Sequence, residues 1–185
     1  APIDLCKMAI NLGCGFVARS FSGSKKQLTA LLRAALSYKG MAVIDVISPC
    51  VTFANNADFY TDYHHVKAND EELHAVDYIP HFTPLEEVEI PGGQYQDVKL
   101  FDGSTLRLAT IEDKHDHSDV VTALSVIHEA ESSGKHVTGL LFYNPEMKTA
   151  DEQLGLTEKP LVDLDEAQLR PSEAALAELN ASFRA

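Results

Sequence analysis

The chain has 185 residues, a formal net charge of −13 and an isoelectric point near 4.9, which argue against nucleic acid and anionic membrane surfaces as partners. It contains no run of 18 apolar residues and no basic stretch followed by an apolar one, so we expect neither a membrane span nor a signal peptide. Three cysteines without close pairing indicate a reducing compartment, so we expect a cytoplasmic protein with one sizeable core.

Helix and strand patterns alternate along the first 47 residues. Apolar residues at helical spacing predict a helix over 2–11, and a short apolar run predicts a strand over 16–19. Residues 25–38 form a strongly amphipathic helical pattern. Residues 41–47 are almost continuously apolar, as in a strand of a parallel sheet that is covered on both faces. This order predicts an α/β fold.

The next hundred residues are less regular. Residues 48–75 predict a long loop, which in a compact domain usually has a function or packs on a partner. Prolines and a Gly-Gly pair make 76–96 mostly extended. A hairpin is predicted over 98–108, because an Asp-Gly turn separates two short strand-like runs. A helix over 118–133 and a strand over 137–143 follow.

The last 40 residues are acidic and interrupted by prolines. We interpret 144–170 as a tail that wraps a neighbouring protein or moves freely, and 171–184 as a helix with Pro171 near its N-terminus.

Cys50 directly follows the predicted strand 41–47, and ligand sites in α/β folds lie beyond the carboxyl ends of strands. The residues alone leave three roles open for it. It could be a small buried apolar side chain, a metal ligand, or a nucleophile with His64 or His65 as its base.

Two segments resemble one enzyme family. Segment 15–21 (Gly-Phe-Val-Ala-Arg-Ser-Phe) and segment 47–53 (Ile-Ser-Pro-Cys-Val-Thr-Phe) are similar to the beta subunits of 2-oxoacid:ferredoxin oxidoreductases. The resemblance implies oxidative decarboxylation of a 2-oxoacid to acyl-CoA and CO₂. It also implies thiamine diphosphate, Mg²⁺ and [4Fe-4S] clusters as cofactors and ferredoxin as the electron acceptor. In this reading Cys50 is a ligand of a [4Fe-4S] cluster, held beside the rigid Pro49.

The resemblance also implies a division of the chain. We expect 1–75 to be the C-terminal part of a thiamine-diphosphate-binding, parallel-sheet domain that carries the cluster-ligand loop. Residues 76–145 would be a small α+β extension of the beta subunit. Residues 146–185, where no resemblance is found, would be an irregular acidic tail with a terminal helix.

The chain cannot complete such a cluster by itself. Cys6 and Cys14 are spaced unlike any cluster motif, and we interpret both as core or helix-end residues. The family's Cys-x-x-Cys pair and its Gly-Asp-Gly segment for Mg²⁺ and diphosphate are absent. The resemblance therefore covers the C-terminal half of a beta subunit. Since the sequence starts at Ala1 rather than Met, we expect a processed chain or a fragment. Its expected partners are the N-terminal part of the beta subunit, the alpha subunit, ferredoxin, coenzyme A and the 2-oxoacid.

Lys25 and Lys26 lie in the first turn of a predicted helix, where the helix dipole disfavours positive charge. A solvated helix face explains them, and so does a phosphate-bearing ligand, since a helix N-terminus offers free N–H groups. The resemblance implies that a lysine of this stretch lies near the path of coenzyme A, which makes Lys25 and Lys26 candidates for binding it. It makes Arg19 a further candidate for substrate binding or for a subunit contact.

The remaining histidines have simpler interpretations. We predict that 115–117 (His-Asp-His) is a solvated loop rather than a metal site, and that His64 and His65 lie at the surface or an interface. We favour 2-oxoglutarate as the substrate, followed by pyruvate. The alternative is a non-catalytic acidic α/β module that binds a partner through its loop and tail, with a structural Cys50.

Overall fold

Strand β1 (Phe16–Phe21) is an interior strand of a mixed sheet, which has four strands among the described residues. This computed structural model describes residues 3–50, 52, 62–88, 90, 95–110 and 115–183. In the order β2-β1-β7-β3, β2 (Ala42–Ile47) runs parallel to β1 and β7 (His136–Tyr143) runs antiparallel to it. The short strand β3 (Asp70–Glu72) runs parallel to β7. The α/β fold class is thus confirmed.

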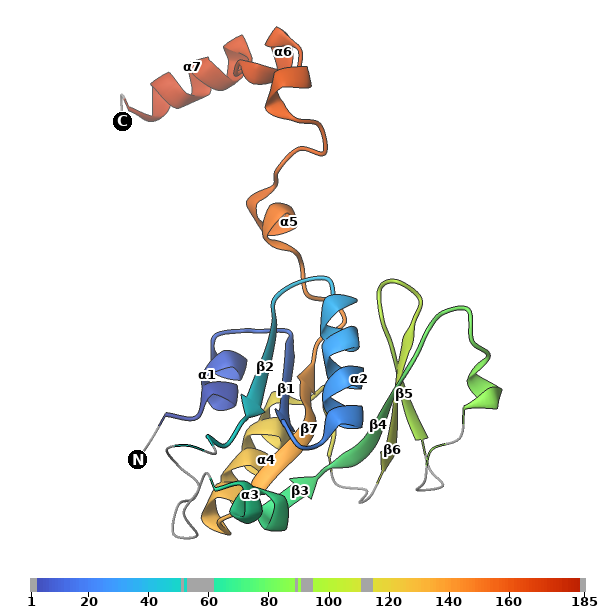
Figure 1. Cartoon of the computed structure of the whole chain (residues 1–185). Helices are drawn as coiled ribbons and strands as arrows, with labels where there is room; N and C mark the ends of the chain where they lie inside the picture. Colours follow the sequence, from blue (N-terminus) through green and yellow to red (C-terminus); the bar gives the residue numbers. More distant parts are fainter. Residues whose placement is uncertain are drawn as a thin grey trace. The chain divides into compact units, whose positions relative to one another are not determined.

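Helices cover both faces of this sheet because its strands alternate their side chains (Figure 1). Phe16 and Ala18 pack with α2 (Lys25–Leu36) on one face. Val17, between them, packs on the other face with α1 (Leu5–Asn11) and α4 (Val120–Ser132). Helix α1 starts later than the pattern 2–11 predicts, because the Asp4 carboxylate caps it by accepting the Lys7 amide at 2.8 Å.

A second sheet of three described strands packs against the other side of α2 (Figure 1). In it β6 (Thr105–Thr110) pairs antiparallel with both β4 (His74–Ile79) and β5 (Tyr95–Lys99). The β5–β6 hairpin confirms the predicted turn: Gly103 adopts φ +81°, a conformation that glycine tolerates without strain.

Two predictions of secondary structure need correction. The region predicted as a loop contains α3 (Tyr63–Asn69), then β3 and the start of β4, while 51 and 53–61 lie outside the described residues. Strand β2 is predicted to be covered on both faces, but it is the edge of the described sheet and most of its side chains are only half-buried. After β4 (His74–Ile79), the region predicted to be mostly extended contains the 3₁₀ turn η1 (Leu85–Glu87).

The chain divides into two units, Ala1–Thr149 and Ala150–Ala185. The second consists of short helical segments, listed here in order: α5 (Ala150–Leu154), η2 (Leu161–Asp163), α6 (Glu166–Leu169) and α7 (Glu173–Ser182). None of its described side chains is buried. Within the described residues of the whole chain, no helix has the length and apolar character that a membrane crossing requires.

Candidate functional site

The carboxyl ends of β1 and β2 bring together three of the residues singled out from the sequence. Phe21 pairs with Ile47 at the ends of these parallel strands, and the Ser22 amide donates to the Ile47 carbonyl at 3.0 Å. Helix α2 begins just after β1 with Lys25 and Lys26, and Cys50 comes just after β2. The two lysines and the cysteine therefore follow the carboxyl ends of neighbouring parallel strands, where α/β folds place their ligand sites.

Cys50 differs from the other two cysteines in exposure. Its side chain is exposed, whereas Cys6 and Cys14 are buried at 0% and 2% exposure, which confirms their interpretation as core residues. Burial raises the pKa of Cys6 to about 12, so without a metal this thiol stays protonated near neutral pH. Cys50 is thus the thiol of this chain that a group outside the fold can reach.

One exposed thiol fits a shared iron–sulfur cluster but not a site built from this chain alone. The part of the chain that the structure describes contains no group of three or more His, Cys, Asp or Glu side chains that could hold a metal ion. A [4Fe-4S] cluster is normally held by four thiolates. If Cys50 held such a cluster, three cysteines would not suffice, and at least one further thiolate would have to come from outside this chain.

A groove of about 370 Å³ opens beside the first turns of α2. The described residues that line it come from α2 and β4: Lys25, Lys26, Thr29, Ala30, Arg33, Asp77 and Tyr78. Lys26 pairs with Asp77 at 3.1 Å, and the Arg33 guanidinium lies 5.8 Å from the centre of the Tyr78 ring. Three cationic groups against one carboxylate give the groove the charge that a phosphate-bearing ligand needs.

Arg19 lies on β1, but its charge is used within the fold. Its Nε donates to Asp45 at 2.9 Å and a terminal nitrogen donates to Asp4 at 2.5 Å, and the side chain is only 9% exposed. Burial would raise the pKa of Asp4, but hydrogen bonds from the Lys7 amide and the Arg19 guanidinium outweigh it and lower that pKa. Arg19 therefore ties the start of α1 to β1 and β2.

The prediction of a solvated loop at 115–117 is wrong for its histidines. His117 is only 6% exposed, and His115 stacks on His74 while one of its ring nitrogens lies 2.9 Å from the Leu141 carbonyl. His74 accepts the Leu140 amide at 3.1 Å, and burial lowers its pKa to about 3, which keeps the ring neutral. Local sequence gives no signal for this cluster, because it forms where distant segments fold over β7.

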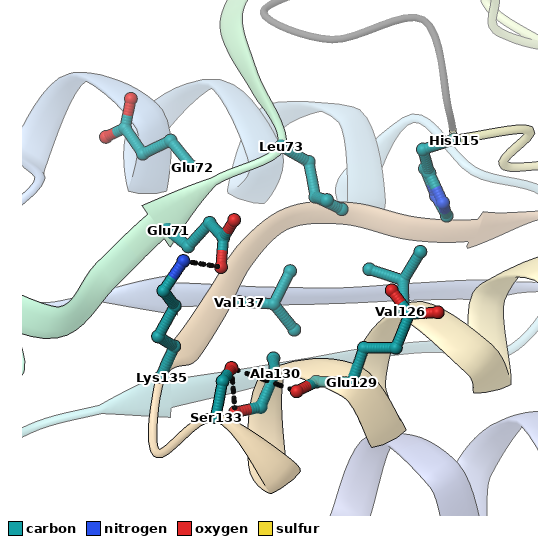
Figure 2. A pocket seen from close by; sticks show the side chains of 10 residues that line it. All are labelled: Glu71, Glu72, Leu73, His115, Val126, Glu129, Ala130, Ser133, Lys135 and Val137. Atoms are coloured by element: carbon teal, nitrogen blue, oxygen red, sulfur yellow. Dashed lines mark hydrogen bonds and ion pairs between the residues drawn. The ribbon is translucent and has the colours of Figure 1, made fainter.

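A separate pocket of about 450 Å³ lies at the opposite edge of the sheet (Figure 2). Residues of β3, β7 and α4 line it, with a floor of apolar side chains that includes Leu73, Val126 and Val137. At its rim Lys135 pairs with Glu71 at 3.2 Å. Strands β3 and β2 are the two outer strands of the sheet. This pocket, beside β3, is therefore distinct from the region that follows β2 and contains Cys50.

Comparison with known proteins links the chain to one enzyme family over part of its length. No family model matches it. It is 33% identical over 85 residues to the 2-oxoacid:ferredoxin oxidoreductase beta subunit of Saccharolobus solfataricus, covering 46% of this chain and 26% of that protein. It is 47% identical over 57 residues to the corresponding subunit of Aeropyrum pernix, covering 30% of this chain and 18% of that one. The matched segments thus span about a quarter or less of these relatives.

A solved structure shares the fold of nearly the whole chain. The 2-oxoglutarate:ferredoxin oxidoreductase of Magnetococcus marinus, with 2-oxoglutarate, coenzyme A and succinyl-CoA bound, matches with a TM-score of 0.52 and 20% identity. The match covers 92% of this chain and 45% of that one. In part of its sequence this chain is therefore similar to beta subunits of 2-oxoacid:ferredoxin oxidoreductases, and in its fold to a chain of a 2-oxoglutarate:ferredoxin oxidoreductase.

Proposed function

We propose that this chain is a segment of the beta subunit of a 2-oxoacid:ferredoxin oxidoreductase that acts in the cytoplasm. The enzyme would convert a 2-oxoacid and coenzyme A to acyl-CoA and CO₂ and pass the electrons to ferredoxin. The observation that carries the proposal is the exposed Cys50, which follows the carboxyl end of β2, where α/β folds commonly place ligand sites. The sequence similarity to beta subunits supports the same reading.

In this proposal each named side chain has one task. Cys50 would hold one corner of a [4Fe-4S] cluster, and Lys25, Lys26 and Arg33 would bind the phosphates of coenzyme A in the groove beside α2. Arg19 remains a candidate for a substrate or subunit contact beside its two carboxylate partners. When bound, thiamine diphosphate with Mg²⁺ and the clusters would supply the decarboxylation and electron-transfer chemistry. The motifs for thiamine diphosphate lie outside this chain.

The preferred substrate in this proposal is 2-oxoglutarate, with pyruvate next. One of the similar proteins is the 2-oxoglutarate synthase subunit KorB of Methanocaldococcus jannaschii, 41% identical over 51 residues. The structural match to an enzyme with 2-oxoglutarate bound points the same way.

The test uses the complete beta subunit, co-expressed with the alpha subunit and purified without oxygen. Iron, acid-labile sulfide and ferredoxin reduction that depends on coenzyme A are measured with 2-oxoglutarate and with pyruvate. We expect a complex that contains iron and turns over 2-oxoglutarate faster. An assembled complex that lacks iron and reduces no ferredoxin would instead support a non-catalytic binding module with a structural Cys50.

A further inference from the structure

A row of hydrogen-bonded polar side chains connects the first turn of α2 to the sheet beneath it. The Ser20 hydroxyl donates to the side-chain carbonyl of Gln27 at 2.7 Å, and the side-chain nitrogen of Gln27 donates to the Thr138 hydroxyl at 3.2 Å. That hydroxyl donates in turn to the Asp70 carboxylate at 2.8 Å. Because these three partners lie on β1, β7 and β3, the row ties α2 to three strands of one sheet.

Gln27 is the member of this row that belongs to the helix, and it is almost completely buried. Its exposed fraction is 5%, while Ser20 and Thr138 are both at 0%. Glutamine is usually exposed, because a buried amide has to find hydrogen-bond partners. Where the partners are present, as here, they hold the side chain in one geometry, which makes a satisfied polar network more rigid than apolar packing. Gln27 thus fixes how the start of α2 lies on the sheet.

The start of α2 depends on this attachment because it has no side-chain cap among the described residues. The Ser24 hydroxyl, at the N-cap position, makes no capping hydrogen bond there. Three other helices of the same unit are capped by a carboxylate that accepts an amide: Asp4, Asp62 and Asp119. In addition, Lys25 and Lys26 place positive charge where the helix dipole disfavours it. The first turn of α2 is therefore held to the sheet through the side chain of Gln27.

The same turn carries the two lysines that line the groove beside α2. Gln27 directly follows Lys25 and Lys26 in the sequence, and both lysines line the groove whereas Gln27 lies beneath the turn. The Lys26 side chain is 72% exposed and has the Asp77 carboxylate 3.1 Å from its ammonium. Exposed lysines of this kind reach a ligand in one geometry only when a buried set of residues fixes the backbone that carries them.

We propose that Gln27 is a positioning residue for coenzyme A, which holds the first turn of α2 so that Lys25 and Lys26 meet the phosphates of the ligand. The inference rests on the proposed function, which supplies coenzyme A as the ligand of the groove. Gln27 acts through the two lysines and does not itself contact the ligand, because its carboxamide is bonded to Ser20 and Thr138 below the turn.

The first test removes the two hydrogen bonds of Gln27 and keeps the size of the side chain. Gln27→Met is made in the complete beta subunit, assembled with the alpha subunit, because methionine is of similar length and is a good helix former. The matched control is Ala34→Gly, at a fully buried position of α2 two turns further on, where glycine weakens the helix and leaves the row of polar side chains intact. KM for coenzyme A, KM for the 2-oxoacid, kcat and urea unfolding are measured for each protein.

We expect Gln27→Met to raise KM for coenzyme A by about fivefold or more, with kcat and KM for the 2-oxoacid within about twofold of wild type. Ala34→Gly should leave all three constants within about twofold of wild type although it lowers stability. An unchanged KM for coenzyme A in Gln27→Met would overturn the proposal. An equal rise in Ala34→Gly would overturn it too, since general loss of stability would then explain the effect.

A double-mutant cycle tests whether Gln27 acts through the lysines. If it does, adding Gln27→Met to the double variant Lys25→Gln with Lys26→Gln should raise KM for coenzyme A by no more than about twofold, because the charges that Gln27 positions are already gone. A further rise as large as that of Gln27→Met alone would show that Gln27 acts independently of the lysines and would overturn the proposal.

Amide hydrogen exchange provides a measurement that does not depend on turnover. In the complete beta subunit, Gln27→Met should speed exchange of the amides of 28–31 by about tenfold or more and leave those of 33–36 nearly unchanged. Equal exchange in both proteins over 28–31 would mean that Gln27 does not hold the first turn, which would overturn the proposal.

Failure of the proposed function has a different outcome. If the wild-type assembly shows no turnover that depends on coenzyme A, the enzyme assignment is lost and with it the positioning role. If the wild-type assembly is active and Gln27→Met has a normal KM for coenzyme A, only the positioning role is lost.

Discussion

At the scale of single residues, Arg19 carries a charge that two carboxylates satisfy inside the fold. Because the guanidinium, Asp4 and Asp45 are all at least three-quarters buried, removing Arg19 leaves two carboxylates without their partner. We predict that Arg19→Met lowers the free energy of unfolding by about 3–5 kcal/mol. Urea unfolding measures this.

The matched control is Lys7→Met, which removes a more exposed ion pair with Glu131 and should cost less than about 1 kcal/mol. An Arg19→Met protein as stable as wild type but with a higher KM for coenzyme A would contradict the structural role and favour the substrate-binding one.

His74 makes stability depend on pH. Its pKa is about 3 in the folded chain because of burial, against about 6.5 in an unfolded one, so between these values the unfolded state binds more protons. Its contribution is present above pH 6.5 and is lost as pH falls. We predict a loss of about 2 kcal/mol between pH 7 and pH 5 from this residue.

His74→Gln keeps an oxygen that can accept the Leu140 amide and removes this titration. Unfolding measured at both pH values should show a smaller loss in the variant. Some loss should remain, because burial also lowers the pKa of His115 and His117. An unchanged loss would mean that His74 is not the group that titrates.

Lys25 and Lys26 can be tested through kinetics in the assembled enzyme. If they bind phosphates, replacing both by Gln should raise KM for coenzyme A several-fold and leave KM for the 2-oxoacid unchanged. Loss of the exposed Lys26–Asp77 pair should cost little stability. Lys67→Gln with Lys99→Gln, two exposed lysines on other elements, is the control. An unchanged KM for coenzyme A would return both lysines to a solvated helix face.

At the scale of elements, sustained periodicity predicts α2, α4 and β7 correctly, because each buries one or both faces against neighbours. Helix α3 and strand β3 escape prediction since they depend on tertiary contacts. Asp62 caps α3 by accepting the His64 and His65 amides, and β3 exists through its pairing with β7.

The sequence likewise predicts some features of the candidate site and not others. The position of Cys50 beyond a strand can be predicted because residues 41–47 are almost continuously apolar. The exposure of its thiol, and the burial of His74 and His117, cannot be predicted, because each depends on which distant segment covers the residue.

The surface formed by strand β2 and helix α1 has features of one that another polypeptide segment covers. Strand β2 is an edge of the described sheet. Leu5 and Met8 of α1 and its C-cap residue Leu12 are exposed at 52%, 45% and 79%. Exposed strand edges and apolar faces promote association. We predict that this chain alone self-associates or melts without cooperativity, and that the N-terminal part of the beta subunit covers this surface.

Light scattering and thermal melting of the chain alone and of the complete subunit check this prediction. The complete subunit should be monodisperse, with one cooperative transition. A monodisperse, cooperatively melting monomer of the 185-residue chain alone would refute it.

At the scale of the whole molecule, the proposed function requires an assembly: Cys50 would supply one cluster ligand, and the other ligands and the thiamine diphosphate motifs would come from elsewhere. Cys50→Ser tests that claim most directly, because an oxygen replaces the soft thiolate that iron–sulfur clusters need. The measurement is iron content, visible cluster absorbance and ferredoxin-linked turnover of the complete assembly, with Cys14→Ala as the control at a buried thiol. We predict that Cys50→Ser loses the cluster or makes it labile and stops ferredoxin reduction, while Cys14→Ala keeps its iron. Full iron and normal turnover in the Cys50→Ser assembly would contradict the assignment of Cys50 as a cluster ligand.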